Sequence, residues 1–113
     1  MADADDVRRI ALGLPESFEA PHFQMTSFRV RKSIFATLPD AGHAHVMVGE
    51  SDIREAVAEN PHCCEERWWG KRLAAVRVDL EAIDTALLTE LLTDAWRRKA
   101  PRTLVRAFDT ATE

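Results

Sequence analysis

The sequence has few of the residues and runs on which the best-known functional motifs depend. Its four glycines are isolated from one another, so no glycine-rich phosphate loop is expected. No apolar stretch approaches the roughly 18 residues needed to cross a bilayer. The start of the chain, residues 1–6, is acidic, whereas a secretory signal begins basic and continues apolar. We therefore expect a cytoplasmic protein with no membrane partner.

The only two cysteines, Cys63 and Cys64, are adjacent. A bond between neighbours closes a strained ring, so we expect free thiols, as in a reducing compartment. The chain has no CxxC motif. Zinc sites take three or four ligands at recognisable spacings, which His43, His45 and His62 do not provide. We expect no metal and no cofactor, and the roles of these histidines and cysteines stay open.

Catalysis would require a nucleophile beside a base and an orienting acid. The candidates are His22, the carboxylates Glu16 and Glu19, and the cluster 62–64. Neighbours along a chain need not meet in space, and carboxylates in a connector are usually solvated. An enzyme hypothesis therefore requires these groups to converge in one pocket. We expect no catalytic activity.

The chain length and composition predict one globular domain over residues 1–113. Of its 113 residues, 46% are apolar and 30% charged, which is ordinary for a single domain with one core. We find no internal repeat, linker or low-complexity tract.

Three helices are predicted from apolar spacing and cap residues. The first spans residues 4–12 with Asp3 as its cap. The second begins at a Ser51 cap and stops before Asn60-Pro61. The longest begins at Asp84, carries a broad leucine-rich stripe and ends at Pro101. Residues 15–21 are interpreted as a connector.

Alternation with period two predicts strands between and after these helices. Residues 27–48 are expected to form a three-stranded meander, and residues 74–80 a further strand. Helices with one apolar stripe need a sheet face to cover. The predicted fold class is therefore α+β, an antiparallel sheet with helices packed on one face.

The alternation assigns side chains to two faces of this sheet. The inward face is aliphatic and comprises Phe28, Val30, Ile34, Ala36, Leu38, Val46, Val48, Val76 and Val78. The outward face mixes cations, histidines and an aromatic, and comprises Arg29, Arg31, Phe35, Thr37, His43, His45, Met47, Ala75 and Arg77.

Charge is segregated along the chain, although the net charge is −4. Residues 21–40 and 71–80 each sum to +2, and residues 97–113 to +3. A basic sheet face that bears an aromatic residue is suited to a polyanion, because cations neutralise phosphates and a ring stacks on a base.

The leading hypothesis is weak binding of nucleic acid, DNA included, through the basic hairpin and the outward face. Its phosphate contacts would be Arg29, Arg31, Lys32 and Arg77, and Phe35 would stack. A plain solvated face is the main alternative explanation of the pattern.

Another hypothesis is a protein-interaction or small-ligand adaptor without catalytic activity. Such an adaptor could be a monomer, or a homodimer that uses Phe35, Met47 or Trp68 as its contact surface.

Several segments, in order along nearly the whole chain, resemble the MmcQ/YjbR-like family. They are His22-Phe23, residues 27–31 with Phe28, residues 34–38, Trp69-Gly70-Lys71, residues 76–80 and residues 95–101. The resemblance implies a frataxin-like (CyaY-like) α+β fold. It also implies a DNA-binding label, given to the family by analogy with a double-wing sheet. The family's first hairpin commonly turns on Gly-Lys, whereas Lys32 and Ser33 stand at those positions here.

Overall fold

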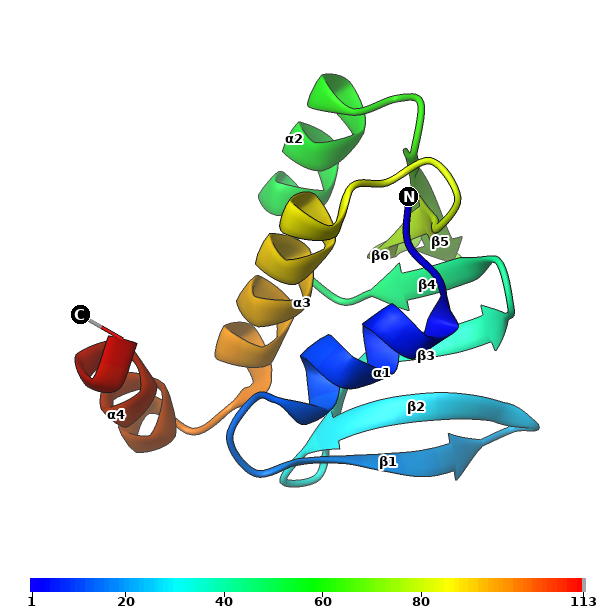
Figure 1. The fold of residues 1–113 in the computed structure, drawn as a ribbon. Coiled ribbons are helices and arrows are strands. Elements are labelled where there is room, and N and C mark those ends of the chain that lie inside the picture. The colour runs from blue at the N-terminus through cyan, green and yellow to red at the C-terminus, as the bar shows by residue number, and fades with distance from the viewer. Residues whose placement is uncertain (113) are drawn as a thin grey trace.

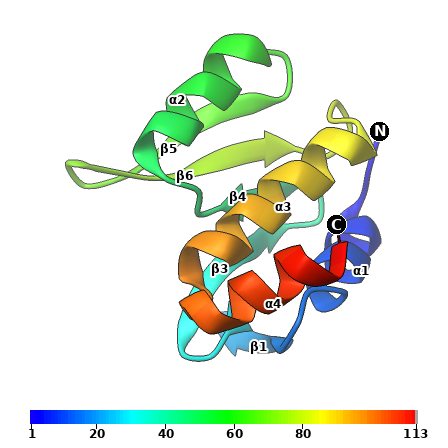
Figure 2. The same ribbon diagram turned by 90° about the vertical axis from the view of Figure 1, so that its left-hand side faces the viewer.

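The computed structural model, which describes residues 1–112, contains four helices and one six-stranded antiparallel sheet. In chain order the elements are α1 (Ala4–Leu12), β1 (Ser17–His22), β2 (Met25–Val30), β3 (Ser33–Asp40), β4 (His43–Val46), α2 (Glu50–Glu59), β5 (Cys64–Trp69), β6 (Arg72–Asp79), α3 (Thr85–Lys99) and α4 (Arg102–Thr112). The strand order is β1-β2-β3-β4-β6-β5, so hairpins form both ends of the sheet. The helices lie on one side of it (Figures 1 and 2). The predicted α+β class is confirmed.

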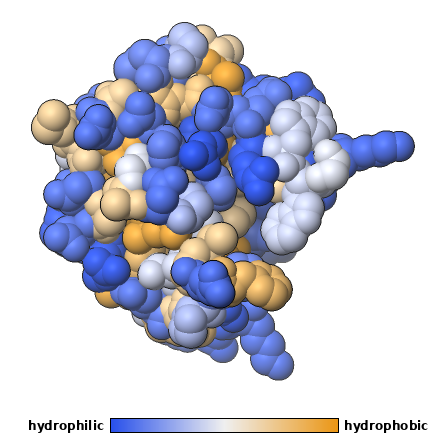
Figure 3. Space-filling view, turned by 90° about the vertical axis from the view of Figure 1, so that its right-hand side faces the viewer, coloured by the Kyte–Doolittle hydropathy of each residue, from blue (hydrophilic) through white to orange (hydrophobic). Residues whose placement is uncertain are grey.

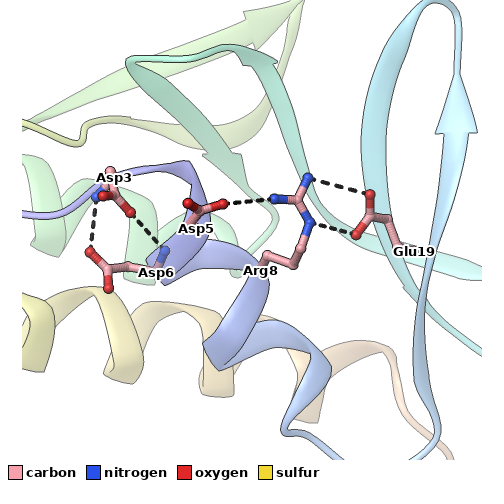
Figure 4. A network of polar contacts seen from close by, with 5 residues as sticks. All are labelled: Asp3, Asp5, Asp6, Arg8 and Glu19. Carbon is pink, nitrogen blue, oxygen red and sulfur yellow. Dashed lines mark hydrogen bonds and ion pairs between the residues drawn. The ribbon is translucent and has the colours of Figure 1, made fainter.

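The first helix begins where the sequence predicts, at Ala4, with Asp3 as its N-cap. Asp3 and Asp6 form a reciprocal capping box, in which each carboxylate accepts from the other's backbone N–H (Figure 4). Arg8 then joins the helix to the sheet, because its guanidinium contacts Glu19 of β1 at 2.8 Å. No helix in the described part of the chain is long and apolar enough to cross a membrane.

Three local predictions were wrong. The segment interpreted as a connector, residues 15–21, contains most of β1, which pairs with β2. The helix α2 starts at Glu50 with Gly49 as its N-cap, so Ser51 lies inside the helix. No helix was predicted beyond Pro101, yet α4 follows it directly.

Asp84 is the N-cap of the longest helix, α3, as predicted, and its carboxylate accepts from the Leu87 backbone N–H at 2.7 Å. The variant Asp84→Ala loses this contact and leaves an N–H group without a partner. We expect its free energy of unfolding to fall by about 1 kcal/mol. Urea denaturation measures the change; an unaltered midpoint would mean that the cap does not stabilise α3.

A β-bulge in β3, in the second hairpin, changes which face of the sheet the neighbouring side chains occupy. Phe28 pairs with Ala36, but the next residue, Arg29, pairs with Ile34, so Phe35 is the extra residue. Phe35 is therefore completely buried with Phe28, and Ile34 lies on the other face. The predictions that Phe35 points outward and Ile34 inward are wrong, and Phe35 cannot stack on a ligand.

Candidate binding cleft

The sheet face opposite the helices is hollowed into a cleft of about 580 Å³. Its floor comprises Thr37, His45 and Ala75, all buried despite being on the outward face. The rest of the lining comes from both end hairpins, from the strands and turns between them, and from the C-terminal end of α3: His22, Phe23, Met25, Lys32, Ile34, Met47, Arg67, Trp69, Arg72, Ala74 and Lys99. This volume is in the range of small-molecule sites, about 300–1,000 Å³.

Two exposed aromatic side chains stand on the rim of this cleft. Phe23 is 81% exposed at the β1–β2 turn and Trp69 is 65% exposed at the end of β5. The pairing registers put these positions at opposite ends of the strands and on opposite sides of the sheet. The two rings therefore lie diagonally across the cleft. In Figure 3, hydrophobic side chains on the side shown form separate small patches among hydrophilic ones.

The turn that carries Phe23 has an unfavourable backbone conformation. Phe23 and Gln24 connect β1 to β2 as a two-residue loop, with φ angles of 48° and 67°. Turns with two positive φ values favour Asn-Gly, and a bulky residue there is an outlier. Neither core packing nor turn preference accounts for a phenylalanine here, which points to a role for its exposed ring.

The cleft is cationic although the chain is acidic overall. Lys32, Arg67, Arg72 and Lys99 line it, and none of its lining residues in the described chain is aspartate or glutamate. Lys99 is partly buried; desolvation, with the charges of Arg98 and Arg72, holds its pKa below the ordinary value. An anion bound here would meet uncompensated positive charge.

Three of the four cations predicted to contact phosphate are held by other groups. Arg29 donates to the Ser27 hydroxyl at 3.0 Å and to the Pro21 carbonyl. Arg31 contacts Glu16 at 2.8 Å. Lys32 is exposed and lines the cleft, so it is the predicted cation that fits best.

The fourth predicted cation, Arg77, lies in a mixed-charge cluster at the other end of the face. It contacts Glu65 at 3.2 Å and Asp40 at 3.8 Å, and it donates to His45 Nε2 at 2.9 Å. The carboxylates offset its charge. His43, also predicted to face outward, contacts Asp40 at 2.9 Å. The acidic side chains thus gather at the β3–β4 turn, away from the cleft cations.

The floor histidine, His45, is held neutral by its surroundings. Burial, together with the charges of Arg77 and Arg67, lowers its pKa to about 4. Because its Nε2 accepts from Arg77, the neutral ring carries its proton on Nδ1.

This pKa shift predicts a loss of stability in mild acid. Between its ordinary value of 6.5 and about 4, His45 takes up a proton only when the chain unfolds. Lowering the pH through this window therefore favours the unfolded state, by up to about 3 kcal/mol. Urea midpoints for the parent and for His45→Gln, measured across the window, should converge at low pH. Parallel curves would contradict the assignment.

Comparison with known proteins shows which family the chain belongs to. The YjbR family model matches residues 12–98, which include every cleft residue except Lys99. The chain belongs to the YjbR family. Uncharacterized proteins of Mycobacterium tuberculosis and Mycobacterium bovis are each 34% identical to it over 124 aligned positions, with 96% of each chain covered.

The fold of this YjbR protein is also found in a solved structure. The crystal structure of protein DR2400 of Deinococcus radiodurans, from the DUF419 family, matches with a TM-score of 0.71. The two chains are 21% identical, and the match covers 85% of this chain and 77% of that one. The likeness establishes a shared fold.

The groups named in the enzyme hypothesis lie in three different places in this YjbR protein. His22 lines the cleft, Glu19 faces Arg8 of α1, and His62, Cys63 and Cys64 line a separate hollow of about 150 Å³. Cys63 and Cys64 are buried free thiols, and burial, with a hydrogen bond to Cys63, raises the pKa of Cys64 to about 12. No group of three potential metal-ligating side chains occurs within residues 1–112.

Sequence reasoning missed three cations of the YjbR cleft, Arg67, Arg72 and Lys99, and did not place Trp69 at a site. Arg67 and Trp69 belong to β5, whose composition shows no clear alternation. A signal existed for the hairpin, since Trp69-Gly70-Lys71 is one of the segments of family resemblance. Gly70 has a φ of 62°, the left-handed conformation that this turn requires. Phe23 was noted as a motif residue, and the structure places it on the rim.

Proposed function

We propose that this YjbR protein is a non-catalytic module that binds single-stranded nucleic acid weakly in the sheet cleft. One observation supports this above others: the cleft combines exposed aromatic rings at two corners with four cations and no lining carboxylate. A ligand suited to it has planar apolar groups and regularly spaced negative charge. Single-stranded nucleic acid has both.

A single strand fits this site better than a duplex does. Stacking on an aromatic side chain contributes about 1–3 kcal/mol per base, but only where the face of the base is accessible. Base pairs in a duplex already stack on one another, so Phe23 and Trp69 would find no free face. The diagonal separation of the two rings would engage two bases some distance apart on one strand.

The proposal changes which residues would bind. Phe23 and Trp69 take the stacking role that the sequence assigned to Phe35, which is buried. The phosphate contacts become Lys32, Arg67, Arg72 and Lys99. Of these, only Lys32 was among the predicted cations.

The test is fluorescence anisotropy with a labelled oligothymidylate about eight nucleotides long, titrated at salt concentrations from about 20 to about 200 mM. Single strands give a slope of log affinity against log salt of about −0.7 per phosphate contact, so up to four contacts predict a slope between −1 and about −3. A duplex of the same length should bind more weakly, because it offers no free base faces.

A double variant in the cleft and a single control variant outside it assign the binding to the cleft. Arg67→Gln with Arg72→Gln should weaken binding and flatten the salt slope by about 1.4. Arg54→Gln should leave both unchanged, because Arg54 faces Glu50 and Glu66 outside the cleft. Absence of binding at the lowest salt, or equal effects of the two variants, would overturn the proposal.

A small anionic planar ligand is the second candidate, favoured by the volume of the cleft. A mononucleotide that binds as tightly as the oligonucleotide would support it over the first. The homodimer proposal has weaker support, because the three residues predicted for its contact surface do not form one exposed patch. Phe35 is buried, Met47 lines the cleft, and Trp68 is not among the residues that line the cleft. Sizing chromatography with Trp68→Ala tests it.

A further inference from the structure

A second hollow adjoins the cleft at the end that carries Trp69. It has a volume of about 170 Å³ and shares Met47, Arg72, Ala74 and Lys99 with the cleft. Arg98 completes its cationic lining. The hollow is less than a third of the size of the cleft, so it suits a group at the end of a ligand.

Three cations crowd this hollow. Burial and the charges of Arg98 and Arg72 oppose the protonated form of Lys99, so the three positive charges act on one another. The one carboxylate in the lining, Glu50, already contacts Arg54 at 3.1 Å. The hollow is therefore a region of net positive charge, with three lining cations against one carboxylate.

The C-terminus of α3 explains the presence of three neighbouring cations, but not the crowding of two of them in this hollow. Arg97, Arg98 and Lys99 all follow the usual preference for cations at a helix C-terminus. Arg97 turns to the α4 side, where it contacts Asp109 at 2.7 Å and Asp94 at 3.4 Å. Arg98 instead donates to the Met47 carbonyl at 3.3 Å, and with Lys99 it lines the hollow. Arg98 and Lys99 are thus directed into the hollow, whereas Arg97 pairs with Asp94 and Asp109.

We propose that this hollow is a subsite for a phosphate monoester, such as the terminal phosphate of a strand bound in the cleft. A monoester carries about −1.5 to −2 charge near neutral pH, more than an internal phosphodiester. Arg72, Arg98 and Lys99 would hold it by charge-assisted hydrogen bonds. The subsite rests on the proposed function for its connection to the strand, and it would give the bound strand a fixed direction.

The test compares three oligothymidylates of one length, with a 5′-phosphate, a 3′-phosphate or no terminal phosphate. We expect one of the phosphorylated ends to raise affinity about fivefold to tenfold, and the other end to have little effect. Lys99→Gln should abolish this gain. Arg106→Gln should preserve it, because that exposed α4 cation lines neither hollow.

Pyrophosphate and a nucleoside monophosphate complete the experiment as ligands without a strand. If the strands bind equally with and without terminal phosphates, the subsite is overturned and the proposed function stands. If no strand binds but these small anions bind through Lys99, the subsite is supported and the proposed function fails. A terminal-phosphate gain that survives Lys99→Gln would overturn the assignment to this hollow.

Discussion

A variant with Phe23→Asn and Gln24→Gly is expected to be more stable than the parent protein and to bind single strands more weakly. Both residues hold positive φ angles in the β1–β2 turn, a conformation that costs about 1–3 kcal/mol for an ordinary residue and little for Asn-Gly. We expect the free energy of unfolding to rise by about 1–2 kcal/mol. Loss of the ring should weaken binding by about fivefold to a hundredfold.

Urea denaturation and anisotropy titration of the same preparations measure the two effects. Gln24→Gly alone is the control, since it relieves part of the turn strain and keeps the aromatic ring. It should gain stability and retain affinity. If the double variant binds as tightly as the parent protein, Phe23 is an exposed residue without a part in binding, and the rim assignment fails.

The second large expected effect is a difference between alanine variants of two tryptophans, Trp96 in the core and Trp69 on the rim of the cleft. Trp96 is completely buried in α3, donates from Nε1 to the Pro15 carbonyl at 3.0 Å and packs against Phe108. Trp96→Ala leaves a cavity and a carbonyl without its donor, so we expect a loss of about 3–5 kcal/mol of unfolding free energy. Trp69→Ala removes the same side chain from the rim, and should change stability by less than about 0.5 kcal/mol.

Binding should show the opposite order. Trp69→Ala is expected to weaken oligonucleotide binding about fivefold to a hundredfold. Trp96→Ala, measured at a temperature where it remains folded, should bind like the parent protein. Calorimetric melting and anisotropy provide the readouts. A large stability loss for Trp69→Ala would show that its ring supports the fold instead of standing free on the rim.

Local signals predicted the helices and the central strands because caps and periodicity act within a few residues. Asp3 and Asp84 mark helix starts correctly, since each carboxylate satisfies an N–H group of its own first turn. The start of α2 was misplaced, because Gly49 provides no side-chain cap to find. The edge strand β1 was read as a connector, since its composition, with Pro21 and Glu19, is atypical for a strand.

The faces of the sheet were less predictable than its strands. A single bulge at Phe35 reverses the inward–outward alternation of side chains locally, and no glycine or turn residue in the sequence indicates its position. That one extra residue moves Phe35 into the core and Ile34 to the cleft. Similarly, the partners that restrain Arg31 and Arg77 are Glu16 and Glu65, which only the folded chain brings near.

The cleft depends on pairing between segments far apart in the chain. Phe23 and Trp69 belong to hairpins at the two ends of the sheet, and the strand order sets the diagonal between them. Sequence reasoning identified a cationic outward face and one of its cleft cations, Lys32. It could not predict which cations are free to bind a ligand, because that depends on which of them the folded chain brings next to carboxylates.

The most direct test of the cleft is the set of indole N–H resonances of a ¹⁵N-labelled sample, since the chain has three tryptophans. Titration with a single-stranded oligonucleotide should shift the Trp69 signal strongly, because that ring lines the cleft. The Trp96 signal should stay in place, since its N–H is bonded to the Pro15 carbonyl inside the protein. A titration that leaves Trp69 unmoved, or moves Trp96 as much, would contradict binding in the cleft.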